Sequence, residues 1–186
     1  MKYEFTGETK TVNGVTVRQI KRISDGLIGG WIESEKNLDQ DGTCFVYSNA
    51  VVYGNARVFG NARVYNNASV YDNAKVYDNA WISGNAKVFG DARVYGNARV
   101  FGNAKVSGDA SVSGNARVYG NARVSGNASV FGNAWVFGNA SVFGNAWVFG
   151  NASVYDNAWV YDYASVSGNA KVFDDASVSG NEVITD

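Results

Sequence analysis

The chain has 186 residues, a net charge of −1, 22 glycines, one cysteine, and neither histidine nor proline. Without histidine, Ser-His and Cys-His catalytic pairs and histidine-held zinc are excluded, and the single thiol, Cys44, excludes a disulfide framework or a multi-cysteine metal site. No stretch approaches 18 consecutive apolar residues, and the opening MKYEFTGETK lacks an apolar run. We therefore expect a cytoplasmic protein of one domain, or of one domain with an appendage, with no signal peptide and no membrane span.

Charge is distributed unevenly along the chain. Residues 46–129 carry nine basic and four acidic side chains, whereas residues 130–186 carry one basic and six acidic. Residues 1–45 are close to neutral, with six basic and seven acidic side chains. Such an end-to-end dipole favours head-to-tail or staggered association of copies over binding to a polyanion.

Residues 1–45 are predicted to form an N-terminal β cap and connector. In TVNGVTVRQI, Asn13-Gly14 lies between alternating β-formers, which predicts a hairpin with a type I′ turn. We expect this unit, with Trp31, Ile32 and Leu38, to cover the first coil of the following domain, and residues 33–43 to be a polar connector. Cys44 lies two residues before Val46, where the following repeat has alanine, so a buried and inert thiol is predicted.

From Val46 to Val183 the chain divides into 23 hexapeptides of the form V-x-G-N-A-x without an insertion. Position one is valine in all units except Ile82, and position five is alanine in all except Glu182. Position four is asparagine in 19 units, and position three is glycine in 16. Because periods of this kind mark repeat folds, residues 46–186 are predicted to form a solenoid.

Each hexapeptide is predicted to be a short strand followed by a corner. Alanine and valine point to one side of the extended backbone and their neighbours to the other. Gly-Asn supplies the residue types that most readily accept a positive φ, so the chain turns every sixth residue. A strand this short must stack on copies of itself, which predicts an all-β, three-sided parallel solenoid of about seven to eight coils.

The aliphatic position one and small position five, as in Val58 and Ala62, resemble the left-handed parallel β-helix of hexapeptide-repeat proteins. A closer resemblance is to a group of bacterial and prophage proteins that join a segment like GGWIESEKNL (residues 29–38) to V-x-G-N-A repeats. The wider resemblance implies the left-handed twist. Proteins of this wider fold include acyltransferases, which rely on a histidine base between subunits, and zinc-dependent carbonic-anhydrase-like enzymes. The resemblance therefore implies one of these activities as a candidate function. This chain has no histidine and no inserted loop, so we expect neither activity.

The outward positions of the repeat, two and six, vary in residue type. Position two is aromatic in 17 units and serine in six, and position six holds arginine, lysine, serine or tryptophan except at Val51 and Val183. Units three apart should lie above one another, giving three faces with stacked rows. Such rows can simply stabilise the rod by ring stacking. The basic rows, interleaved with aromatics, could also suit a single-stranded nucleic acid. The modest charge is spread around the rod, however, so we do not expect nucleic acid as the partner.

A collar of aromatic residues is the candidate contact surface. Between Arg123 and Asp156 lie 32 residues without a charge, and soluble monomers rarely leave so large an apolar surface bare. The predicted interface for a second copy or another protein lies within and just after this stretch and points outward on all three faces. It comprises Phe131, Trp135, Phe137, Phe143, Trp147, Phe149, Trp159 and Tyr161.

The last coil contains the one charged residue predicted at an inward position. Glu182 would place a carboxylate at an inward position and protect the open edge from further pairing. The alternative is a frayed last unit with Glu182 in solvent. We expect a non-enzymatic structural or interaction module without cofactor or metal. The alternative is a ligand-binding or acyltransferase-like hexapeptide-repeat protein with its site between subunits.

Overall fold

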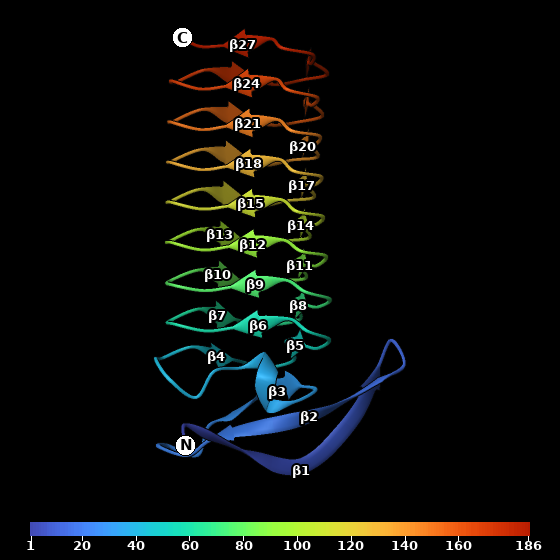
Figure 1. Cartoon of the computed structure of the whole chain (residues 1–186), viewed down its shortest axis with the longest axis vertical. Coiled ribbons are helices and arrows are strands. Elements are labelled where there is room, and N and C mark those ends of the chain that lie inside the picture. Colours follow the sequence, from blue (N-terminus) through green and yellow to red (C-terminus); the bar gives the residue numbers. More distant parts are fainter.

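The computed structural model describes all 186 residues as a β-solenoid closed at one end by a hairpin (Figure 1). The chain begins with β1 (Tyr3–Val12), β2 (Val15–Arg22), β3 (Ile28–Ile32) and a 3-10 turn, η1 (Glu35–Asn37). Strands of two residues follow, from β4 (Phe45–Val46) to β27 (Val183–Ile184). No helix has the length and apolar character that crossing a membrane would require.

The strands form three sheets, one on each side of the solenoid. The first sheet continues from β1, β2 and β3 into β5 (Val51–Val52), β8 (Ser69–Val70), β11 (Lys87–Val88), β14 (Lys105–Val106), β17 (Arg123–Val124), β20 (Ser141–Val142), β23 (Trp159–Val160) and β26 (Ser177–Val178). The second sheet holds β4, β7 (Arg63–Val64), β10 (Trp81–Ile82), β13 (Arg99–Val100), β16 (Arg117–Val118), β19 (Trp135–Val136), β22 (Ser153–Val154) and β25 (Lys171–Val172). The third sheet holds β6 (Arg57–Val58), β9 (Lys75–Val76), β12 (Arg93–Val94), β15 (Ser111–Val112), β18 (Ser129–Val130), β21 (Trp147–Val148), β24 (Ser165–Val166) and β27.

Each solenoid strand pairs in parallel with the strand three units later, as Lys87 pairs with Lys105 and Val88 with Val106. The predicted fold class is therefore confirmed. The number of turns is about nine, slightly above the predicted seven to eight, because residues outside the repeat also stack. Trp31 and Ile32 of β3 pair in parallel with Val51 and Val52, and Leu38 forms a parallel bridge to Val58.

Valine and alanine fill the interior as predicted. From Val52 to Val166, every position-one and position-five side chain has no exposed surface. Fully burying a valine side chain is worth about 1.5–3 kcal/mol, so a repeated valine stack can stabilise a thin rod.

The two corner positions of each repeat, three and four, differ in backbone conformation. Position three has a positive φ in every unit, whether it is glycine, as at Gly84 (φ 69°), or another residue, as at Asp72 (φ 58°). The asparagines at position four do not share this conformation, so the prediction that both corner residues supply positive φ was wrong for asparagine.

The N-terminal hairpin has the predicted geometry and covers the first turns. Asn13 and Gly14 both have positive φ, as a type I′ turn requires. The Tyr3 hydroxyl donates to the Leu38 carbonyl at 2.8 Å, and Tyr3 belongs to the same buried cluster as the solenoid valines. The Asn37 amide donates to the carbonyls of Gly54 and Ala56, which joins η1 to the first repeats.

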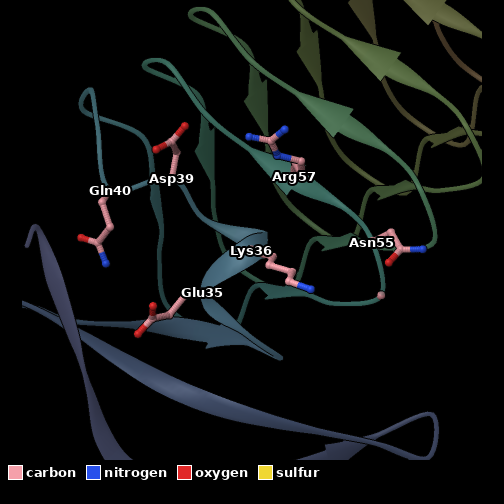
Figure 2. A pocket seen from close by; sticks show the side chains of 7 residues that line it. Glu35, Lys36, Asp39, Gln40, Asn55 and Arg57 are labelled. Carbon is pink, nitrogen blue, oxygen red and sulfur yellow. The ribbon is translucent and has the colours of Figure 1, made fainter.

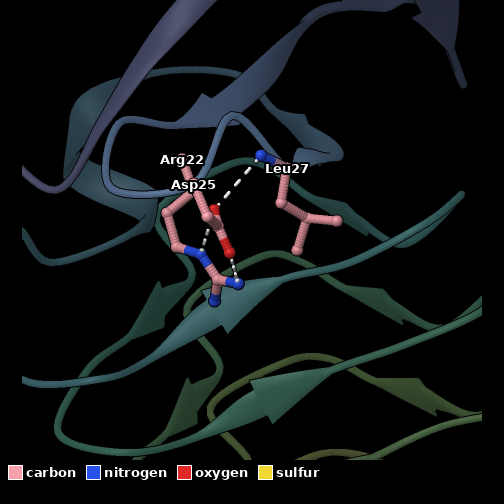
Figure 3. Close-up of polar contacts among 3 residues, drawn as sticks. All are labelled: Arg22, Asp25 and Leu27. Atoms are coloured by element: carbon pink, nitrogen blue, oxygen red, sulfur yellow. Dashed lines mark hydrogen bonds and ion pairs between the residues drawn. The ribbon is translucent and has the colours of Figure 1, made fainter.

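The turn between β2 and β3 is held by a bidentate ion pair (Figure 3). Arg22 Nε donates to Asp25 Oδ1 at 2.9 Å, and the Leu27 amide donates to the same oxygen at 3.2 Å. The hydrogen bonds from Arg22 and then from Leu27 lower the pKa of Asp25 to about 2.

Candidate interaction surface

The position-two aromatics stack along each face of the solenoid. On the third face, Tyr77 and Tyr95 lie 4.9 Å apart at an interplanar angle of 1°. On the second face, Tyr119 and Phe137 lie 5.0 Å apart, also at 1°. Because neighbouring strands are about 4.8 Å apart, ring stacking follows directly from the strand register.

The four tryptophans from Trp81 onward share one packing arrangement. Each contacts the position-two ring that lies 16 residues earlier, which is its diagonal neighbour across the sheet. The centroid distances are 5.7 Å for Trp81–Tyr65, 6.4 Å for Trp135–Tyr119, 6.3 Å for Trp147–Phe131 and 5.9 Å for Trp159–Phe143. One side of each indole is thus supported by the rod while the rest faces solvent.

The eight collar residues lie on all three faces of the solenoid. The structure divides them among the three faces: Trp135 and Phe137 on the second, Phe131, Trp147 and Phe149 on the third, and Phe143, Trp159 and Tyr161 on the first. Within the collar, each face therefore presents one exposed tryptophan, with exposed fractions of 39% for Trp135, 54% for Trp147 and 53% for Trp159. A single flat partner can cover only one of these groups.

The solenoid's basic residues form rows beside the aromatics. Arg63 and Arg99 lie over the Trp81 ring at 5.6 and 5.1 Å, and Arg117 lies over Trp135 at 5.0 Å. On the first face, Lys87, Lys105 and Arg123 follow one another in register and are exposed. The two ion pairs of the structure lie in the N-terminal cap, so these stacked cations have no acidic partner within the chain.

Asparagine ladders run along the corners, a feature that the sequence analysis missed. Along two of the corners each position-four amide donates to the side-chain oxygen one coil later, as Asn103 does to Asn121 and Asn121 to Asn139, at 3.1 and 3.0 Å. One corner has an unbroken ladder from Asn49 to Asp175 and another from Asn61 to Asp186. The constancy of asparagine at position four was the available signal, because a turn alone would also accept glycine or aspartate there.

The third corner, between the first and third faces, has an interrupted ladder. The Asp91 carboxylate accepts a hydrogen bond from the Asn73 amide, but it cannot donate one to Asp109 in the next coil. A second interruption lies further along, where Tyr163 replaces asparagine two coils above Asn127. Above Asn145 the ladder stops, and a hollow of about 570 Å³ opens among Asn127, Asn145, Trp147, Tyr163 and Ser165. Tyr163 is 68% exposed, so its ring and that of Trp147 both border this hollow.

A second hollow, of about 590 Å³, lies where the cap meets the solenoid (Figure 2). It is lined by Glu35, Lys36, Asp39, Gln40, Gly54, Asn55 and Arg57. Charged side chains of both signs spread around its wide opening and do not converge on one point (Figure 2).

The corner aspartates serve the backbone. The carboxylates of Asp72, Asp78 and Asp162 accept hydrogen bonds from the amides of Gly90, Gly96 and Gly180, one coil later. Nowhere do three or more Cys, Asp or Glu side chains gather in a way that could hold a metal ion.

Cys44 is buried, and the Lys2 ammonium donates to its Sγ at 3.0 Å. Burial raises the pKa of this thiol above its usual range. The predicted burial is confirmed, while the predicted inertness stays a prediction.

Glu182 lies in a last coil that remains hydrogen-bonded. Its carbonyl accepts from the Ser165 amide at 2.8 Å, and its exposed carboxylate accepts from the Ser179 amide at 3.3 Å. Edge protection by this carboxylate stays a prediction.

Comparison with known proteins agrees with the repeat geometry. A family model described as YdcK Beta solenoid repeat matches residues 56–72, 92–108, 110–126, 116–132 and 122–138. These segments lie within the hexapeptides, so the resemblance of residues 29–38 stays an expectation. No curated protein matches the chain. The matched repeats and the three parallel sheets together identify the chain as a β-solenoid repeat protein.

Proposed function

We propose that this solenoid is a rigid, non-enzymatic interaction module that binds a protein surface, foremost a second copy of itself, through its exposed aromatic groups. The observation that carries the proposal is the set of exposed tryptophans Trp135, Trp147 and Trp159, of which the first two lie within 32 residues that have no charge and the third lies just after them. Tryptophan and tyrosine dominate the energetics of protein interfaces, and exposed apolar groups of this size favour association.

The non-enzymatic part of the proposal is supported by what the polar side chains do. Corner asparagines bond to one another, and corner aspartates such as Asp72 and Asp78 accept backbone amides. These groups therefore act in the architecture of the rod.

Light scattering after size exclusion, over a range of protein concentrations, tests self-association. Three single variants, Trp135→Ser, Trp147→Ser and Trp159→Ser, each remove the tryptophan of one face. Serine occupies the next position of the same row in every case, at Ser153, Ser165 and Ser177, so the fold should tolerate it. We expect an oligomer that one of these variants converts to a monomer, while Trp81→Ser, outside the collar, leaves the mass unchanged. A monomeric wild-type protein at every concentration would contradict self-association.

A second candidate function is the binding of a neutral saccharide at the Trp147–Tyr163 hollow. The interrupted ladder favours it, because Asn145 has no side-chain acceptor above it and Trp147 offers an exposed ring on which a sugar could stack. Titration of tryptophan fluorescence with neutral oligosaccharides tests this candidate. Tyr163→Asn, which restores the repeat, should abolish a response that Trp135→Ser leaves intact.

A further inference from the structure

The first face is covered at one end and free along the rest. Val12 and Val15 of the hairpin pack against the cluster of Val17, Val51 and Tyr53, and Asn13 donates to the Tyr53 hydroxyl at 2.9 Å. Tyr71 of the next coil packs against the same cluster. Figure 1 shows the hairpin tip rising to the level of β5. The six strands beyond, β11, β14, β17, β20, β23 and β26, carry no such cover.

The position-two row of these six strands is complementary to its own reversed copy. In chain order its residues are Phe89, Ser107, Ser125, Phe143, Tyr161 and Ser179. If a second copy lies antiparallel on this face, with the two-fold axis between β17 and β20, Phe89 faces Ser179. In the same register Ser107 faces Tyr161 and Ser125 faces Phe143. Every ring thus meets a gap left by a small side chain, and the register uses the whole free length.

The position-six row adds electrostatic complementarity. In the same register Lys105 of one copy faces Trp159 of the other, which suits a cation–π contact. The corner beside this row carries the exposed Asp156, Asp174 and Asp175. These aspartates lie in the coils that face Lys105 and Lys87, two cations with no partner in their own chain. Complementary charges of this kind fix the register of an interface.

We propose that two copies of this chain associate side by side and antiparallel through the first face, with β17 and β20 at the two-fold axis. This proposal rests on the proposed interaction function and specifies its partner, face and register. At the opposite corner the register sets Asp109 against Asp162, a like-charge pair that keeps the dimer weak and reversible.

The other faces lack this complementarity. The second face has a ring at seven of its eight position-two sites, with Ser83 as the one gap. On the third face, a reversed copy centred at mid-length, between β15 and β18, sets Tyr95 against Phe149, ring against ring.

Cysteine cross-linking in a Cys44→Ala background tests face and register together. Ser125→Cys places its thiols across the proposed axis, offset by about 5 Å along the rod, which is one strand spacing. Ser179→Cys lies on the same row, but the two copies of it would be about 24 Å apart, or five strand spacings. Ser113→Cys occupies the same repeat position on the third face. With a short bis-maleimide we expect a covalent dimer for Ser125→Cys alone.

The other outcomes contradict the register, the face or the dimer itself. Equal cross-linking of Ser125→Cys and Ser179→Cys would mean a parallel pair and contradict the register. Cross-linking of Ser113→Cys alone would contradict the face while leaving the interaction function intact. A monomer by light scattering with no cross-link at any site would contradict both.

A charge swap provides an independent measurement of the same register. Lys105→Glu should weaken the dimer about tenfold by sedimentation equilibrium, and adding Asp156→Lys should restore the affinity. Failure of the second change to rescue the first would contradict the facing of these two coils.

Discussion

At the residue scale, the corner asparagines form hydrogen-bonded ladders. The ladder between the first and third faces is interrupted at Asp91 and Asp109, and we expect the solenoid to be less stable there. Asp91 and Asp109 lie one coil apart, and neither carboxylate can donate to the other. In the intact ladders each asparagine donates upward, as Asn103 does to Asn121. We expect Asp109→Asn to raise the free energy of unfolding by about 0.5–1.5 kcal/mol, because it restores a donor to Asn127 and removes a like-charge contact.

Urea unfolding at neutral pH measures this effect. Asn121→Asp is the matched control, because it removes the donor to Asn139 in an intact ladder and should lower stability by a similar amount. Equal midpoints for all three proteins would show that the ladders contribute nothing to stability.

Also at the residue scale, the corner glycines meet two separate demands. A Cβ at Gly84 would lie 2.8 Å from the Gly102 carbonyl oxygen, whereas a Cβ at Gly180 would have nothing within 4 Å. Both have positive φ. Gly180→Ala should therefore cost about 1 kcal/mol for backbone strain alone, and Gly84→Ala clearly more, as a lower thermal midpoint would report. Equal losses would mean that the backbone contact between coils is irrelevant.

At the element scale, the hairpin depends on a buried tyrosine. Tyr3 is 1% exposed, and burial, followed by the nearby Glu35, Cys44 and Asp39 charges, raises its pKa to about 12. The unfolded chain ionises near the ordinary value of about 10, so the folded state binds the proton more tightly. This contribution to stability is complete below pH 10 and is lost as the pH rises from about 10 to 12, by about 2–3 kcal/mol.

The measurement is the free energy of unfolding as a function of pH. Tyr3→Phe should be less stable by about 1 kcal/mol near neutral pH, since the Leu38 carbonyl loses its donor. Its stability should then fall less steeply between pH 10 and 12 than that of the wild type. Tyr161→Phe, on the free face, is the control. Identical pH slopes for wild type and Tyr3→Phe would contradict the assignment.

Elements within the repeat could be predicted from the sequence, and those outside it only in part. The strict V-x-G-N-A pattern determines strands, corners and the interior, and Asn13-Gly14 determines the hairpin. β3 has no repeat motif, so its stacking on β5 was not predictable from periodicity. Its Gly29 and Gly30 allow this approach, because a Cβ there would lie 2.8 Å from Phe45 Cε1 and 2.6 Å from the Ala50 carbonyl oxygen. The division of the collar into three faces follows from the 18-residue register. The corner ladders depend on side-chain hydrogen bonds between coils, for which the constant asparagine at position four was the one signal in the sequence.

At the scale of the whole molecule, the solenoid's stability should be local and nearly additive. Each strand contacts the strands directly above and below, as β11 pairs with β8 and β14 and with no more distant strand of its sheet. In such one-dimensional folds, stability is a sum of unit terms and nearest-neighbour terms. Perturbations in adjacent coils should therefore couple, and those several coils apart should not.

A pair of double-mutant cycles tests this organisation. Val88→Ala, Val106→Ala and Val160→Ala should each cost about 2 kcal/mol, because each removes fully buried methyl groups. Val88 and Val106 are paired in register, so their double variant should deviate from additivity by more than about 0.5 kcal/mol. Val88 and Val160 are four coils, or about 19 Å, apart, and their losses should add. The free energies come from urea unfolding of the monomer, with Trp159→Ser as the shared background if the wild type dimerises. Equal coupling for both pairs would mean that the core behaves as one cooperative unit, and a contact on one face would then be felt along the entire rod.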